Sequence, residues 1–112
     1  MTTIWHNPRC SKSRATLALI EDAGVTPEIR LYQENAPDEA EIRAALELLN
    51  IPASELIRTG ETLYKELGLK DADNDALIKA MAEHPKLIER PVVLNNGQAA
   101  LGRPPESVLK IL

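Results

Sequence analysis

The first part of the chain combines two hydrophobic periodicities. Apolar residues over 3–5 predict the end of a short strand. From Ser11 onward, apolar residues recur at helical spacing, with Leu17 and Ile20 on one face. Gly24 follows this pattern and predicts the end of the helix. The segment therefore predicts a strand followed by a helix.

A second strand is predicted after Pro27. Over residues 28–32, Ile29 and Leu31 alternate with polar residues, which is typical of a half-buried strand. The order strand, helix, strand favours a parallel pair of strands joined by a right-handed crossover. We therefore expect the N-terminal part of the chain to form one βαβ unit.

The middle of the chain carries only helical patterns. Asp38 is suited to cap the first helix, and Glu41 three residues later completes a capping box. Asn50 is a plausible stop for that helix. Its apolar stripe contains Ile42, Ala45, Leu46 and Leu49, and further helices are predicted over 53–58, 61–67 and 77–82. We interpret residues 38–84 as an all-helical insertion within a single domain, 1–112.

The C-terminal part returns to a strand pattern. Residues 91–94 predict a strand, Asn96-Gly97 is a strong signal for a hairpin turn, and 98–101 predict the return strand. Pro105 opens a final helix. The residues expected on its buried face are Val108, Leu109 and Leu112. The predicted fold class is α/β, a mixed β-sheet with the helical insertion between the βαβ and ββα parts.

Composition narrows the class of protein. The chain has 44% hydrophobic and 27% charged residues, as globular domains do. Only 3% of its residues are aromatic and none is Phe, so we expect an aliphatic core. A net charge of −4 argues against binding of nucleic acid, which needs a basic face. No apolar segment is long enough for a signal peptide or a membrane span, so we expect no membrane partner.

The number of cysteines indicates where in the cell the protein is found. A single cysteine excludes an internal disulfide, and nothing in the chain suggests secretion. We therefore expect a cytoplasmic protein. Separately, we expect a monomer.

The chemically distinctive segment is 6–14, His-Asn-Pro-Arg-Cys-Ser-Lys-Ser-Arg. Cys10 lies at the start of the predicted helix, where unpartnered backbone N–H groups favour anions. The nearby cations are Arg9, Lys12 and Arg14. A thiol in such surroundings has a pKa below the value of about 8.5 for free cysteine. We interpret Cys10 as a reactive thiolate rather than an inert buried residue, whereas His6 suits an active-site role and a structural one equally.

Single positions exclude several other sites. A phosphatase-like loop needs an arginine six positions after the cysteine, where the chain has Thr16. A dithiol site needs a second cysteine where the chain has Ser13. The spacing of His6, Cys10 and His84 matches no zinc pattern, so we expect no metal site.

Four motifs resemble one known family along nearly the whole chain. In order, these are His6-Asn7-Pro8-x-Cys10, Leu56-Ile57-Arg58, His84-Pro85-x-Leu87-Ile88-x-Arg90-Pro91-Val92-Val93 and Gly102-Arg103-Pro104. They are similar to signatures of the glutaredoxin-coupled arsenate reductases, which have a thioredoxin-like fold. The resemblance implies that fold here, and with it a cis bond between Arg90 and Pro91 that directs Arg90 toward Cys10.

The resemblance also implies a chemistry. Cys10 as a thiolate would attack arsenate and form a covalent thiol–arsenate adduct, with His6 tuning the thiol. Arg58, Arg90 and Arg103, which alone would be interpreted as solvated surface residues, correspond to arginines that bind the oxyanion. Ser11 is expected beside them as a substrate-binding residue.

The expected partners follow from the same family. Glutathione would be a co-substrate that attacks the adduct, glutaredoxin would release arsenite, and no cofactor would be bound. Two alternatives remain open, a glutathione-linked oxidoreductase of the same fold with another substrate, and a non-enzymatic regulator that binds RNA polymerase. The three arginines favour the arsenate reductase, and the absence of a second cysteine counts against the regulator.

Overall fold

Helices and strands were assigned in a computed structural model that describes residues 1–112. In chain order the elements are β1 Thr2–Trp5, α1 Ser11–Asp22, β2 Glu28–Arg30, α2 Glu39–Leu49, α3 Ala53–Leu56, α4 Thr62–Glu66, the 3-10 helix η1 Leu69–Asp71, α5 Asn74–Glu83, η2 Pro85–Leu87, β3 Val92–Asn95, β4 Gln98–Leu101 and the 3-10 helix η3 Pro105–Ile111. All elements between β2 and β3 are helical, which confirms the predicted insertion.

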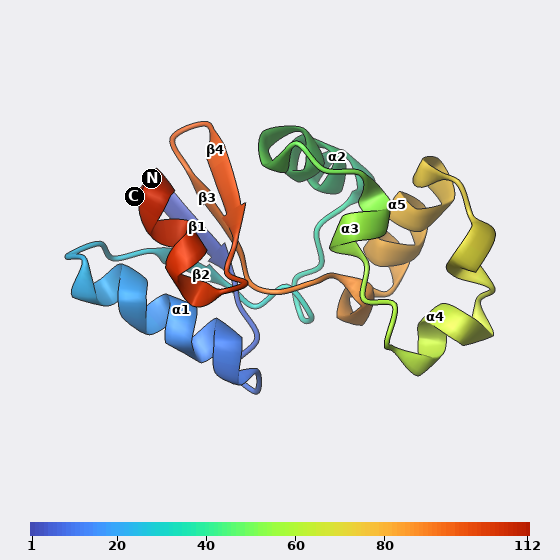
Figure 1. The fold of residues 1–112 in the computed structure, drawn as a ribbon, viewed down its shortest axis with the longest axis horizontal. Helices are drawn as coiled ribbons and strands as arrows, with labels where there is room; N and C mark the ends of the chain where they lie inside the picture. The colour runs from blue at the N-terminus through green and yellow to red at the C-terminus, as the bar shows by residue number, and fades with distance from the viewer. The chain divides into compact units, whose positions relative to one another are not determined.

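The four strands form one mixed sheet in the order β2-β1-β3-β4 (Figure 1). β1 pairs parallel with β2, as the βαβ pattern predicted, and antiparallel with β3. β3 and β4 form the predicted hairpin, whose turn residues Asn96 and Gly97 have φ of 49° and 78°. Two positive φ values suit a type I′ turn, which explains why the Asn-Gly pair occurs there. The predicted α/β fold class is confirmed.

The chain forms two compact units. The first unit comprises residues 1–35 and 90–112, and the second comprises 36–89. The predicted insertion, 38–84, lies within the second unit. The capping box that begins α2 is present there, because Asp38 Oδ1 accepts the backbone N–H of Glu41 at 2.8 Å and Glu41 Oε1 accepts that of Asp38 at 3.2 Å. Asn50, in the left-handed region with φ of 57°, ends α2 as predicted.

The first unit has its core between the sheet and two helices. α1 and η3 lie side by side on one face of the sheet (Figure 1). Their apolar residues pack against the sheet in a cluster that contains Ile4, Ile20, Val93, Ala100, Val108 and Ile111. This cluster anchors α1, whose first turn carries Cys10, to the sheet.

Aromatic residues correct the expectation of a purely aliphatic core. Trp5 is 2% exposed and Tyr32 is fully buried, so the few aromatic residues are used inside the protein. The Arg30 guanidinium lies 5.9 Å from the centre of the Trp5 ring, which suits a cation–π contact.

Two predictions about buried faces were wrong. Val108 is buried as predicted, but Leu109 is 44% exposed. Because η3 is a 3-10 helix with three residues per turn, Ile111 rather than Leu109 faces the core together with Val108. Ile29 and Leu31 are 46% and 38% exposed. β2 is an edge strand, and it ends at Arg30 before Leu31 is reached.

No helix of the chain is long and apolar enough to cross a lipid bilayer.

A buried polar network ties the sheet to the C-terminus. The Thr2 hydroxyl of the buried network donates to Asn95 Oδ1 at 2.9 Å, and Asn95 Nδ2 donates to the Ile111 carbonyl at 2.6 Å.

This network predicts a stability effect. Asn95→Ala should lower the free energy of unfolding by about 1–3 kcal/mol, because the Thr2 hydroxyl and the Ile111 carbonyl are left buried without partners. Denaturant unfolding measures the change. Gln98→Ala, at an exposed position of the neighbouring strand, serves as the control and should stay within about 0.5 kcal/mol of the parent. Equal stability of the two variants would contradict the role of Asn95.

Candidate active site

Cys10 occupies the position immediately before α1. Its backbone is extended, with φ of −93° and ψ of 123°, and its side chain is partly exposed. Its backbone N–H donates to the Asn7 carbonyl at 3.0 Å, so residues 7–10 form a tight turn into the helix. Cys10 therefore lies at the helix N-terminus, as the sequence predicted.

The surroundings of Cys10 favour its thiolate. Burial raises the pKa of the thiol, but the backbone N–H groups of Ser13 and Lys12 and the guanidinium of Arg90 lower it, and the net pKa lies below the ordinary value. The thiol itself makes no capping hydrogen bond. Deprotonation makes the sulfur an acceptor for these N–H groups, as a side chain at a helix N-cap should be.

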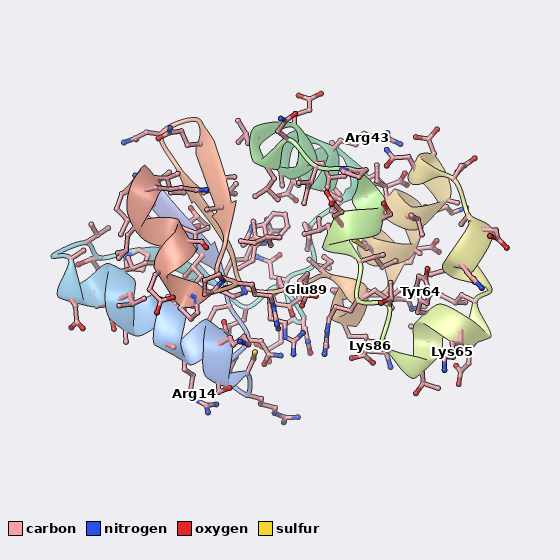
Figure 2. The ribbon with its side chains drawn as sticks, in the orientation of Figure 1. Arg14, Arg43, Tyr64, Lys65, Lys86 and Glu89 are labelled. Atoms are coloured by element: carbon pink, nitrogen blue, oxygen red, sulfur yellow. The ribbon has the colours of Figure 1, made fainter.

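Arg90 is the cation that acts on Cys10. It contributes both its charge and a side-chain hydrogen bond to the lowered pKa of the thiol. The side-chain charges expected from the sequence to act on the thiol, those of Arg9, Lys12 and Arg14, are not among the causes of this shift, and Lys12 contributes only through its backbone N–H. Arg14 instead donates to the Pro8 carbonyl at 2.8 Å and projects from the N-terminal end of α1 (Figure 2).

Two loops, one before β3 and one after β4, each hold an arginine followed by a cis proline. The Arg90–Pro91 bond is cis, which confirms the prediction, and the Arg103–Pro104 bond is also cis. Arg103 Nε donates to the Arg90 carbonyl at 3.0 Å, and the Gly102 N–H donates to the Pro91 carbonyl at 2.9 Å. Two sequence-distant segments, each containing a predicted oxyanion-binding arginine, therefore lie side by side.

Gly102, in the segment that follows β4, lies against α1. A Cβ at this buried position would collide with the Thr16 hydroxyl and the ring of Pro91. Thr16 is itself fully buried and donates to the Lys12 carbonyl at 2.8 Å. The sequence carried no signal for this close approach beyond the glycine itself.

His6 is bound to Ser13 rather than to Cys10. Its Nδ1 lies 2.7 Å from Ser13 Oγ, which also accepts the Asn7 N–H at 3.0 Å. The Ser13 hydroxyl, which accepts the Asn7 N–H, can donate its own proton to Nδ1 of a neutral ring, and that ring then carries its proton on Nε2. Burial lowers the pKa of His6 and the charge of Arg14 lowers it further, so the ring is neutral at neutral pH. His6 thus reaches Cys10 only through Ser13, a link that the sequence did not reveal.

The remaining predicted residues lie apart from these contacts. Ser11 is the exposed first residue of α1. Arg58 belongs to the second unit, where its Nη1 pairs with Glu61 at 2.7 Å and its Nε lies 3.9 Å from Glu89. That Arg58 and Ser11 bind substrate stays a prediction. No three His, Cys, Asp or Glu side chains gather as a metal site would require.

Comparison with known proteins places this site in a family. The model of the ArsC family matches residues 5–111. The chain belongs to the ArsC family. It is 54% identical over 97% of its length to an uncharacterized protein of Escherichia coli (strain K12), YfgD, of which it covers 94%. It is 47% identical, again over 97% of its length, to a protein of Neisseria meningitidis named arsenate reductase, of which it covers 96%.

A solved ArsC structure supports the same assignment. An arsenate reductase from Vibrio cholerae superposes with a TM-score of 0.96 and 52% sequence identity, covering 99% of this chain and 97% of that one. The family and the thioredoxin-like fold that the four motifs suggested are thereby confirmed.

The first prediction for this ArsC protein concerns its thiol. The rate of Cys10 alkylation should rise with pH around a midpoint below the value of about 8.5 for free cysteine. Arg90→Met should raise that midpoint, because it removes a charge and a hydrogen bond that favour the thiolate. Arg9→Met is the matched control and should leave it unchanged. An Arg90→Met midpoint equal to that of the parent would show that Arg90 does not act on the thiol.

The second prediction concerns the junction at Gly102. Gly102→Ala should lower the free energy of unfolding by about 1–3 kcal/mol, because the added methyl group overpacks the contact with Thr16 and Pro91. Denaturant unfolding gives the value. Gly60→Ala is the control, since a Cβ there meets no atom within 4 Å. If Gly102→Ala is as stable as Gly60→Ala, the junction is not tightly packed.

Proposed function

We propose that this chain is an arsenate reductase that depends on glutathione and glutaredoxin. The observation that carries the proposal is a single thiol whose thiolate is favoured by a helix N-terminus and by Arg90. The membership of the ArsC family and the relatives named arsenate reductase support the substrate. The proposed site of action is the cytoplasm.

The first step is nucleophilic attack by Cys10 on arsenic. The sulfur–arsenic bond forms and one arsenic–oxygen bond breaks, with hydroxide leaving as water once it takes a proton. Arsenic stays pentavalent in this step. In the proposed step Arg90 and Arg103 neutralise the oxyanion, since a planar guanidinium pairs well with two oxygens of a tetrahedral anion. We propose the same role for Arg58, which would have to exchange Glu61 for the oxyanion, and a substrate hydrogen bond for Ser11.

Reduction then requires two thiols from outside the chain. Glutathione attacks arsenic in the adduct, which forms a second sulfur–arsenic bond and releases another water. A glutaredoxin thiolate then attacks the glutathione sulfur. A sulfur–sulfur bond forms, the bond between glutathione and arsenic breaks, and its electron pair stays on arsenic, which is reduced from As(V) to As(III). Water hydrolyses the remaining sulfur–arsenic bond, so that arsenite leaves and the Cys10 thiolate is regenerated. The chain has no second cysteine that could take either place.

A coupled assay tests the proposal. Arsenate-dependent NADPH oxidation should require glutathione, glutaredoxin and glutathione reductase together, and thioredoxin with its reductase should support little turnover. Cys10→Ser should abolish it, because the hydroxyl group is far less acidic than the thiol. Gln98→Ala serves as the matched folded control, since its side chain is exposed on β4.

The outcomes separate the rival functions. Equal rates with thioredoxin alone would refute the glutathione mechanism. Absence of arsenate turnover, together with reduction of a glutathione–peptide mixed disulfide, would favour the oxidoreductase with another substrate.

A further inference from the structure

A groove in the first unit lies beside the Cys10 turn and has no part in the steps described above. Its volume is about 410 Å³, within the range of small-molecule sites. One wall is the segment His6, Asn7, Pro8 and Arg9, and the other is formed by Leu31, Gln33 and Glu34. The groove is thus built between the turn that carries the nucleophile and the segment that follows β2.

The charges of the groove suit a zwitterion rather than an oxyanion. Arg9 and Glu34 are both exposed and of opposite sign. His6 is neutral, because burial and Arg14 lower its pKa. An arsenate ion needs an excess of positive charge, which Arg90 supplies at Cys10. The groove instead offers one cation and one anion.

The polar groups around this pair are suited to a peptide. His6 Nδ1 is bonded to Ser13, so Nε2 is the ring nitrogen left for a hydrogen bond to a ligand. The side-chain amide of Gln33, which is exposed, can both donate and accept. Pro8 and Leu31, with Leu31 38% exposed, add apolar surface. The groove thus combines amide-type hydrogen bonding with a carboxylate-binding and an ammonium-binding end.

The groove and the nucleophile share one turn. The Cys10 N–H is bonded to the Asn7 carbonyl, and the Arg9 N–H donates to Asn7 Oδ1 at 3.0 Å. Arg9 is the residue immediately before Cys10, so one wall of the groove and the nucleophile belong to the same turn.

We propose that this groove binds the thiol co-substrate, a short peptide thiol with free carboxylate and ammonium groups, and glutathione in particular. The proposal rests on the proposed reductase function. The glycine carboxylate of the tripeptide pairs with Arg9, the ammonium of its γ-glutamyl end pairs with Glu34, and the α-carboxylate beside that ammonium stays in solvent. In this proposal the central cysteine attacks arsenic in the Cys10 adduct, and its sulfur becomes one of the two sulfurs of the disulfide formed with glutaredoxin.

Binding of an unreactive analogue tests the groove without any turnover. S-methylglutathione, titrated into the reduced full-length protein and followed by NMR, should shift amide signals of residues 6–9 and 31–34. Arg9→Met and Glu34→Gln should each weaken its binding about two- to fivefold, as expected for loss of one exposed ion pair. Lys110→Met and Glu106→Gln are charge-matched controls on the far helix η3 and should bind like the parent.

A modified ligand identifies the pairing. The ester of S-methylglutathione at its glycine carboxylate should bind the parent more weakly than the free acid, whereas Arg9→Met should bind the two alike. In the coupled assay, Arg9→Met should raise the KM for glutathione and leave the alkylation midpoint of Cys10 unchanged.

The outcomes distinguish the two proposals. If Arg9→Met and Glu34→Gln both turn over arsenate with the same KM for glutathione as the parent, the groove proposal is wrong and the proposed reductase function is unaffected. An increase in the KM for glutaredoxin alone would overturn it in favour of a protein-docking surface. Specific binding of S-methylglutathione without arsenate turnover would support glutathione binding in the groove and contradict arsenate as the substrate.

Discussion

The packing of Gly102 against Thr16 and Pro91 is the contact on which the Cys10 site depends. Thr16 belongs to α1, whose first turn carries Cys10, and Pro91 follows Arg90 in the loop that leads into β3. A methyl group at residue 102 would force these segments apart. Because the hydrogen bonds and charges that favour a thiolate weaken with distance, the lowered pKa of Cys10 requires this close approach.

The turn formed by residues 7–10 separates two kinds of electrostatic surroundings. On the Cys10 side, the backbone N–H groups of Ser13 and Lys12 and the guanidinium of Arg90 favour negative charge. On the groove side, Arg9 and Glu34 carry opposite charges, and His6 is kept neutral. A second positive charge at His6 would make the groove attract oxyanions and compete with the site at Cys10. Holding the imidazole neutral through burial is therefore consistent with two ligands of different charge beside one sulfur.

Local signals in the sequence predicted most of the fold. The capping box of Asp38 and Glu41, the Asn96-Gly97 turn and the strand–helix–strand order each depend on neighbouring residues, and all three are present. Features set by distant contacts were not predictable in this way. The exposure of Leu109 depends on the 3-10 geometry of η3. The cation at Cys10 is Arg90, eighty positions away, which the family resemblance suggested but the local sequence did not.

Ser13 shows why a single thiol suits an external reductant. In a dithiol enzyme, the residue three positions after the reactive cysteine supplies the resolving sulfur. Here that side chain is fully buried and directed to His6 and Asn7, while Cys10 is partly exposed. The Ser13 side chain thus has a structural role, since it bonds His6 and holds the turn before α1. Its backbone N–H still stabilises the thiolate. In the proposed mechanism, a chain arranged in this way receives its second sulfur from solution, and the partly exposed Cys10 beside the proposed zwitterion-binding groove is suited to receive it.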